Sequence, residues 1–358
     1  MNSDALVQRL LAAVQAQQLG AVPDRRLAGA PISDFPSVDL AVVGFAAQRA
    51  PVWAHVLFSR HASQGFTARV GSQGERAGNV HYWSDVTDAN KVSIAWQAHA
   101  DWTRLPQTDL AAATQQPALR FIAPYPASLL KLMVAIGLGL ALDAGLLQAG
   151  DIQASARAMI VDSDNDATTQ MVRKLHECGL IARGPQGEVH NALNELLASR
   201  GLGSLRLSDT ASDGGWGNFA GSGVGHIHMT AWDTVRLLWL LDPDAPPAPW
   251  PGAAPLMSKA SRDLILNWMG EPSPNRILFR DEIASGIHFF HKTGTTENYV
   301  SDAGIVRALP PGKRHYIVAF LSNLGSRYGP PGAEFDVSPK LSGLGLAVDA
   351  AMREILGA

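Results

Sequence analysis

Apolar residues recur at helical spacing at the start of the chain. They share one face of a helix, with Leu6, Val7, Leu10, Leu11 and Val14 as its members. Ser3 or Asp4 can cap this helix, and Gly20 can end it. The segment lacks the basic region, unbroken apolar stretch and cleavage site of a signal peptide. We therefore expect a cytoplasmic protein from the chain as written, with a periplasmic location as the alternative.

Short runs rich in β-branched and aromatic residues fill residues 37–122. These runs are VDLAVVGFA, VWAHVLFSRH, FTARV, NVHYW and KVSIAWQ. Gly, Asp, Asn and Gln residues separate them, as is typical of turns between strands. The pattern predicts an antiparallel sheet region.

The pattern becomes helical from Ser128 to about Leu241, beginning with the apolar stretch LLKLMVAIGLGLALDAGLL. The uncharged part of this stretch lies between Lys131 and Asp143 and is far shorter than the roughly 20 residues that span a bilayer. A helix that is apolar on every side must be surrounded by protein. We therefore predict a buried central helix, with Ser128 at its N-terminal end in a cleft.

The proline-rich residues 242–255 are expected to form a surface connection. Behind them we predict a helix in SKASRDLILNWM, strands around IHFFHKTG, DAGIVRAL and HYIVAFLSN, and a terminal helix in GLGLAVDAAMREIL. The order is strands, helices, strands and helix. This order predicts an α+β fold, in which an antiparallel sheet is built from both chain ends and an all-helical lobe is inserted between them.

Composition narrows the classes of function. Of the 358 residues, 46% are hydrophobic and 17% are charged, which is typical of a globular protein. The net charge of -3 gives no field that would attract nucleic acid or an anionic membrane, so neither is an expected partner. Cys178 has no partner for a disulfide and is expected to be a small buried hydrophobe. His226 and His228 lack a third ligand at useful spacing, so no metal site is predicted.

Three short motifs follow one another along the chain. They are Ser128-Leu129-Leu130-Lys131, Ser163-Asp164-Asn165 and Lys292-Thr293-Gly294. Each motif alone is a weak signal, because tripeptides of this kind occur by chance. Their combination, with each in the structural setting that its chemistry requires, is a strong one.

The first motif joins a nucleophile to an amine. Positions i and i+3 of a helix share a face, so the amine of Lys131 lies beside the hydroxyl of Ser128. Apolar surroundings favour the neutral amine, which can then take the serine proton. The free N–H groups at the helix start stabilise negative charge that develops near Ser128. The alternative for such a motif is an N-capping serine followed by a surface lysine.

The second motif falls in a turn between two helical runs. A hydroxyl from Ser163 and an amide from Asn165 could face the cleft there, as proton relay and hydrogen-bond donor. The alternative is a simple capping turn.

The third motif closes an apolar strand. Gly294 would leave the strand surface bare, so that a substrate backbone can lie against it. Lys292 and the threonine hydroxyls offer contacts to a carboxylate, and the N–H of Thr295 can complete an oxyanion hole. His291 and Glu297 flank the motif and are expected to tune the cleft. The alternative is an edge strand with a solubilising lysine.

The chain resembles the superfamily of serine β-lactamases and penicillin-binding DD-peptidases, and most of all the class A β-lactamases. The likeness extends over FIAPYPASLLKLMVA, AMIVDSDNDATTQMV, MTAWDTVRLLWLL, PLMSKASRDLILNWM and HKTGTTENYVSDAGIV, which occur in the expected order. It implies a β-lactamase/transpeptidase-like fold. Residues 119–358 would form the catalytic region, and residues 1–118 an N-terminal helix with an extra β-rich region, in one compact unit.

The resemblance also implies a role for each motif residue in acylation. Ser128 would be the acylated nucleophile, Lys131 its activating amine and Ser163 the hydroxyl that relays a proton to the leaving nitrogen. Lys292 would complete the catalytic group.

The remaining motif residues would bind the substrate. Asn165 would bind its amide, and Lys292 with Thr293 its carboxylate, along the strand that contains Gly294. The N–H groups of Ser128 and Thr295 would form the oxyanion hole. The resemblance implies a small-molecule or peptide substrate and no metal or organic cofactor, and we expect a monomer.

The chain departs from class A in the loop that follows the second motif. Class A enzymes have a glutamate there, which activates the water that hydrolyses the acyl-enzyme. The corresponding stretch, LRLSDTASDGGWGNFAGSGVGH, contains Asp209 and Asp213 but no glutamate. These aspartates, or Lys131 acting again as base, are the candidates for deacylation. We therefore expect slow release of the acyl group.

The sequence thus favours a serine hydrolase that forms an acyl-enzyme with β-lactams, D-alanyl peptides or related amides and esters. One alternative keeps this chemistry but passes the acyl group to an amine, as in peptide or natural-product assembly. Another is a penicillin-binding sensor that is acylated once. A purely structural protein would have no reason to keep all three motifs.

Overall fold

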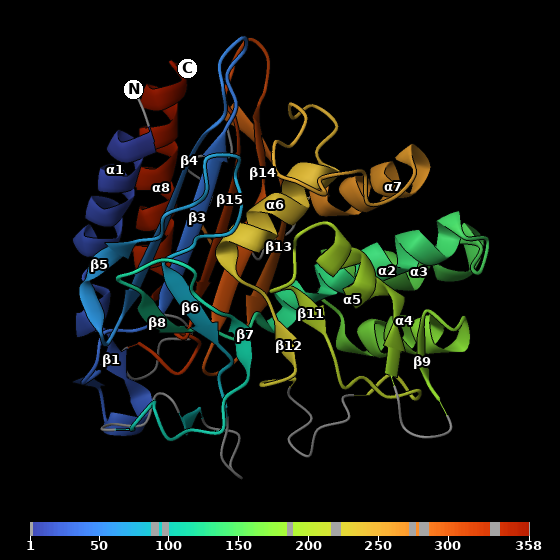
Figure 1. Ribbon diagram of the computed structural model, residues 1–358, viewed down its shortest axis with the longest axis horizontal. Coiled ribbons are helices and arrows are strands. Elements are labelled where there is room, and N and C mark those ends of the chain that lie inside the picture. Colours follow the sequence, from blue (N-terminus) through green and yellow to red (C-terminus); the bar gives the residue numbers. More distant parts are fainter. Residues whose placement is uncertain are drawn as a thin grey trace.

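A six-stranded antiparallel sheet runs through the centre of the molecule (Figure 1). The computed structural model describes residues 3–86, 93–94, 100–184, 189–215, 223–271, 277–278, 286–329 and 337–357. In sheet order, the strands are β13 (Ile287–Thr295), β14 (Val300–Ala308), β15 (His315–Ser322), β3 (Val38–Gly44), β4 (Val52–Ser59) and β5 (Ala62–Thr67). Pairing of β15 with β3 joins the two ends of the chain, as predicted.

Helices cover both faces of this sheet, so its central strands are buried on both sides. Leu40 and Val42 of β3 pack into a core with α1 (Ser3–Ala16) and α8 (Val337–Leu356). Their neighbours in β3, including Ala41, point to the opposite face, which α6 covers. Helix α6 comprises Ala231–Leu241. Burial on both faces explains why the strands are continuous apolar runs rather than alternating ones.

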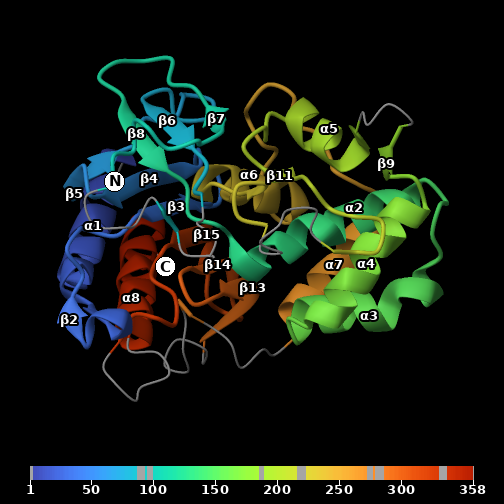
Figure 2. The same cartoon turned by 90° about the horizontal axis from the view of Figure 1, so that it is seen from below.

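The helical lobe lies beside the sheet and surrounds α2 (Figure 2). Its helices are α2 (Lys131–Asp143), α3 (Ala149–Val161), α4 (Asn165–Glu177), α5 (Ala192–Ser199) and α7 (Lys259–Gly270). Every residue from Lys131 to Gly139 is buried, so α2 is the central helix that its composition predicts. In the described part of the chain, no helix has the length and apolar character needed to cross a membrane.

A second, three-stranded sheet corrects the prediction for residues 37–122. It consists of β6 (Val80–Trp83), β7 (Asp109–Ala111) and β8 (Leu119–Ile122), and β6 pairs with β8 in parallel. The run NVHYW therefore belongs to a separate sheet and not to the central one. A long connection separates these two strands, which makes the parallel pairing possible. Of the run KVSIAWQ, only Ser93 and Ile94 lie within the described residues.

Short two-stranded ladders and 3-10 turns complete the fold. The strands are β1 (Pro23–Asp24), β2 (Ala30–Pro31), β9 (Ile181–Arg183), β10 (Val189–Asn191), β11 (Arg206–Leu207) and β12 (Ile227–His228). The turns are η1 (Leu19–Ala21), η2 (Arg25–Leu27) and η4 (Ala127–Leu130). Turn η4 leads directly into α2 and contains Ser128, at the junction of sheet and helical lobe.

Candidate active site

Ser128 lies in the 3-10 turn that precedes α2. The residue before it, Ala127, has a φ of 50°, a left-handed conformation that strains a residue with a side chain. The hydroxyl of Ser301 donates to the carbonyl of Pro126 over 2.6 Å and anchors the start of the turn to β14. The Ser128 side chain is half-buried and lines the pocket described below. The turn therefore holds the serine in a fixed place at the edge of a cavity.

Gly294 allows the turn to approach β13. A Cβ atom at this position would lie 2.3 Å from the carbonyl oxygen of Pro126 and 2.7 Å from the nitrogen of Leu129. Both distances are shorter than any contact that a real side chain makes, and both partners are backbone atoms. The sequence predicts that the bare strand makes room for a substrate. The structure corrects that reason, because the space is filled by the turn that contains Ser128.

Lys131 is buried and contacts the second motif. Its Nζ donates to the carbonyl of Ser163 at 2.5 Å and to Oδ1 of Asn165 at 2.9 Å, with longer contacts of 3.3 Å to Ser163 Oγ and the carbonyl of Asp164. Burial lowers the pKa of the Lys131 amine to about 8, against the opposing effect of Asp164. A substantial fraction of the amine is therefore neutral near physiological pH.

Ser163 stands in the turn between α3 and α4, as predicted. Its φ of 56° is left-handed, and the next residue, Asp164, caps α4 by accepting from the N–H of Ala167. The Ser163 hydroxyl accepts from Lys292 Nζ at 2.9 Å and from Lys131 Nζ at 3.3 Å. One hydroxyl thus connects the first motif with the third.

Lys292 brings a second amine to the same hydroxyl. Its Nζ also donates to the carbonyl of Thr293 at 2.8 Å. Burial lowers the pKa of Lys292 to about 7, with the charge of Lys131 acting in the same direction and Asp302 opposing both. Because two amines on one hydroxyl repel each other when both are charged, the pair shares its protons around neutral pH.

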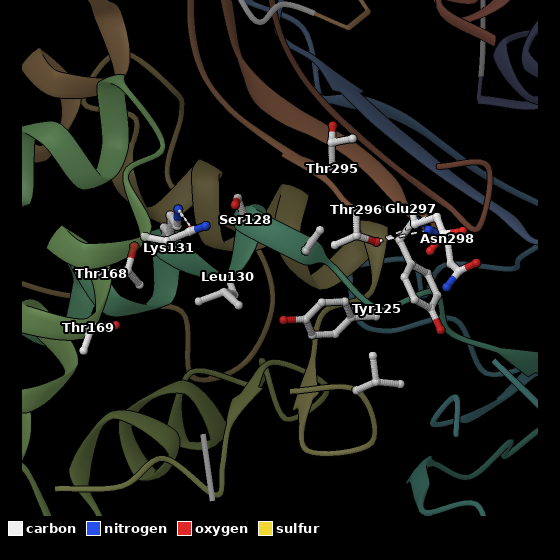
Figure 3. Close-up of a pocket in the computed structure, with 14 residues that line it drawn as sticks. Tyr125, Ser128, Leu130, Lys131, Thr168, Thr169, Thr295, Thr296, Glu297 and Asn298 are labelled. Atoms are coloured by element: carbon white, nitrogen blue, oxygen red, sulfur yellow. Dashed lines mark hydrogen bonds between the residues drawn. The ribbon is translucent and has the colours of Figure 1, made fainter. Parts of the chain in front are cut away.

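A pocket of about 450 Å³ opens beside these groups (Figure 3). Four of the sequence-predicted residues line it: Ser128, Lys131, Asn165 and Thr295. Ser163, Lys292, Thr293 and Gly294 are not among its lining residues. Of this second group, Ser163 and Lys292 adjoin the pocket through their contacts with Lys131 and with each other.

Most of the other lining residues were not predicted. They are Tyr125, Ala127, Leu130, Thr168, Thr169, Val224, Thr296, Asn298 and Tyr299, together with Glu297, which was expected to tune the cleft. Nearly all of them lie within a few positions of a motif. Thr168, for example, is one helical turn beyond Asn165 in α4, so helix periodicity could have found it.

Neither candidate deacylation aspartate lines the pocket, which corrects the expectation that one of them turns toward an ester on Ser128. Asp209 forms ion pairs with His226 and, at 3.7 Å, with Arg183. Asp213 is exposed, and its Oδ1 accepts from the N–H of Gly215. Residues 216–222 of the same loop lie outside the described residues.

Glu297 is the one acidic residue among the described residues that line the pocket. It forms an ion pair with Arg26 of η2. The described residues contain no group of three or more histidines, cysteines or acids that could hold a metal. Burial lowers the pKa of His228 to about 3, so this histidine is neutral. The chemistry of the pocket therefore rests on hydroxyls, amines and backbone N–H groups.

A comparison of the sequence with known protein families agrees with the predicted resemblance. A sequence model described as the beta-lactamase enzyme family matches residues 147–335, more than half of the chain. The chain belongs to this beta-lactamase family. The match begins beyond Ser128, so the assignment rests on the second and third motifs and on the helices and strands around them. No match was found among curated proteins.

Solved structures similar to this beta-lactamase family member include enzymes and penicillin-binding proteins. A point mutant of PBP-A, in an acyl-enzyme complex with penicillin G, has a TM-score of 0.53 at 15% identity, covering 99% of this chain and 98% of that one. The TLA-3 extended-spectrum beta-lactamase has a TM-score of 0.51 at 13% identity, covering 99% and 100%. A class A beta-lactamase from Bacteroides cellulosilyticus has a TM-score of 0.51 at 14% identity, covering 98% and 99%. At such identities the likeness shows the fold, which is the predicted one.

Proposed function

We propose that the protein is a serine hydrolase that forms an acyl-enzyme on Ser128 from a β-lactam, a D-alanyl peptide or a related amide or ester. The observation that supports this most is the placement of the Ser163 hydroxyl between the amines of Lys131 and Lys292, next to the pocket that Ser128 lines. Motifs that are far apart in sequence thus converge on one proton-transfer centre.

In the proposed acylation, the neutral amine of Lys131 takes the proton of Ser128 as Oγ attacks the carbonyl carbon. The N–H groups of Ser128 and Thr295 stabilise the oxyanion. Ser163 passes a proton to the leaving nitrogen as the amide bond breaks, and Lys131 restores the proton of Ser163. Asn165 binds the substrate amide, and Lys292, with Thr293, binds its carboxylate, whose negative charge favours the protonated form of Lys292 over that of Lys131 once substrate is bound.

Deacylation is proposed to be slow. A general base typically contributes about 100 to 10,000-fold to such a step. Within the described lining, Glu297 is the acid available, and its carboxylate is engaged by Arg26. Lys131 remains as the candidate base that lines the same pocket as Ser128. The same arrangement favours one alternative, in which an amine replaces water as acceptor and the protein is an acyltransferase.

The test is the intact mass of the protein after incubation with penicillin. We expect the mass to increase by one penicillin in wild type and to remain unchanged in Ser128→Ala. Ser155→Ala is the matched control, because Ser155 lies on α3 and contacts Gln170, and neither residue lines the pocket. Wild type that stays unmodified at saturating penicillin contradicts the proposal. Product analysis with added amines separates the hydrolase from the acyltransferase.

A further inference from the structure

A buried carboxylate lies behind the pocket wall, in a part of the chain that the family match does not include. Asp85 follows β6 and is 2% exposed. Its oxygens accept hydrogen bonds from the hydroxyl of Ser93 at 2.7 and 2.8 Å, the backbone N–H of Val86 at 2.7 Å and the hydroxyl of Tyr299 at 2.7 Å. The last of these donors belongs to a pocket-lining residue.

Tyr299 connects this carboxylate with two parts of the pocket. Its ring packs edge-on against Tyr125, with centroids 5.6 Å apart, and Tyr125 lies three residues before Ser128. Its backbone carbonyl accepts from the N–H of Thr296 at 2.9 Å, and its own N–H donates to Thr296 Oγ1 at 3.1 Å. The ring of Tyr299 therefore contacts Tyr125 and its backbone contacts Thr296, and both of these residues line the pocket (Figure 3).

Residues 296–299 form a turn, and backbone hydrogen bonds from a second segment of the chain also hold it in place. Backbone N–H groups of Ser326 and Arg327 donate to the carbonyls of Thr296 and Glu297. The turn backbone is thus held without Asp85, whereas the phenol of Tyr299 donates to the Asp85 carboxylate and is also hydrogen-bonded to Ser93, itself a partner of Asp85. Loss of that carboxylate should release the ring rather than unfold the turn.

The carboxylate also reduces stability at neutral pH. Burial raises the pKa of Asp85 to about 6, with the hydrogen bonds from Ser93, Tyr299 and Val86 opposing the shift. The folded pKa lies above the unfolded value, so this group's contribution to the free energy of unfolding falls as pH rises from about 4 to about 6. Tyr299 and Tyr328 are the titratable groups that face it. An asparagine of the same shape would avoid this destabilisation.

We propose that Asp85 is a positioning residue that holds the Tyr299 ring and, through it, the Tyr125 side of the pocket. Its effect falls on substrate binding rather than on the acylation step, because it touches neither Ser128 nor the amines. The kinetic part of this proposal rests on the proposed function. The structural part, which couples Asp85 to two tyrosine rings, does not.

The first test needs no substrate. The chain has five tyrosines, so the ring signals of ¹³C-tyrosine-labelled protein can be assigned by single Tyr→Phe variants. We expect the Tyr299 and Tyr125 signals to shift with a midpoint near pH 6 in wild type and to lose this transition in Asp85→Asn. If the Tyr299 ring signals change neither with pH nor in Asp85→Asn, the proposal is wrong.

A matched control is available far from the pocket. The carboxylate of Asp349 accepts from the hydroxyl of Tyr316 at 2.8 Å, a second buried Asp–Tyr pair between α8 and β15, in which Asp349 also pairs with Arg314 at 2.6 Å. Asp349→Asn should change the Tyr316 signals and leave those of Tyr299 and Tyr125 in place. A shift of the Tyr299 signals in this variant would show a general effect of lost buried carboxylates and count against the proposal.

The second test measures acylation by penicillin. Because less restrained Tyr299 and Tyr125 rings must be ordered when substrate binds, the penicillin concentration at half-maximal rate should rise about tenfold in Asp85→Asn, with the limiting rate within about twofold of wild type. Asp349→Asn should change neither value. A lower limiting rate at an unchanged half-maximal concentration, or no change in either, refutes the binding role. If wild type is not acylated, the proposed function fails, while the ring signals still decide the role of Asp85.

Discussion

The two halves of the proposed reaction cycle rest on parts of the molecule that are built very differently. The amines proposed for acylation come from Lys131 of α2 and Lys292 of β13, and they meet at the half-buried hydroxyl of Ser163, while Ser128 of η4 lines the adjoining pocket. The candidates for deacylation, Asp209 and Asp213, stand on a loop outside the pocket. The side chain of Asp209 is 42% exposed. The fold thus brings the proposed acylation amines together at one hydroxyl, whereas it does not place either candidate deacylation aspartate at the pocket.

Packing explains the difference. The acylation groups are fixed by backbone contacts, such as the approach of Gly294 to the turn around Ser128 and the cap that Asp164 gives α4. Asp209 instead engages His226 and Arg183, which hold its carboxylate away from the pocket lining. Preorganised groups on rigid elements support catalysis, whereas an exposed ion pair contributes little.

The largest expected effect concerns the acylation side. Lys131→Ala removes the proposed base, which lines the same pocket as Ser128, so the rate of acylation by penicillin should fall by about 100 to 10,000-fold. Stopped-flow or quenched mass measurements give this rate. Lys259→Ala is the control, since Lys259 is an exposed lysine paired with Asp263 on α7. Equal rates in Lys131→Ala and wild type would remove this lysine from the mechanism.

The next prediction compares the rates of acylation and deacylation in one experiment. A chromogenic cephalosporin should give a burst of one product per enzyme, followed by a steady rate about 100 to 10,000-fold slower. The reason is that acylation has Lys131 as its proposed base, whereas Glu297, paired with Arg26, is the one carboxylate among the described residues that line the pocket. Rapid turnover without a burst would mean that another group activates water.

The two regions also differ in how much of their structure could be predicted from the sequence. The order of strands and helices and the buried α2 follow from local periodicity, whereas the joint site of the three motifs was expected from the resemblance to the β-lactamase family. The parallel pairing of β6 with β8 does not follow from local periodicity, because it depends on a long connection. The space required at Gly294 depends on the approach of another backbone, and the position of Asp209 depends on ion pairs formed only in the folded chain. Long-range contacts of this kind leave no local signature.

A smaller effect should appear in stability. Burial lowers the pKa of Lys292 to about 7, and the charge of Lys131 acts in the same direction. The folded pKa lies below the unfolded value, so the destabilisation is complete below about pH 7 and is relieved as pH rises toward about 10. Wild type should therefore gain Tm relative to Lys292→Met between pH 6 and pH 9. A Tm difference that stays constant over this range would mean that Lys292 keeps its proton in the folded protein.

The last prediction concerns deacylation, and we expect almost no change in its rate. In Asp209→Asn and Asp213→Asn, release of the acyl group from Ser128 should stay within about twofold of wild type, because neither carboxylate lines the pocket and a true general base would contribute at least about 100-fold. Asp209→Asn should lower stability only slightly, since its pairs with His226 and Arg183 are exposed.

Decay of the penicillin adduct, followed by intact mass, measures the rate of release. Each variant must first reach full acylation so that only release is compared. A loss of about 100-fold or more in either variant would show that the loop moves its aspartate to the ester once Ser128 is acylated. Unchanged decay in both leaves Lys131 as the base next to the ester, and the pH at which decay accelerates should then follow the Lys131 pKa of about 8.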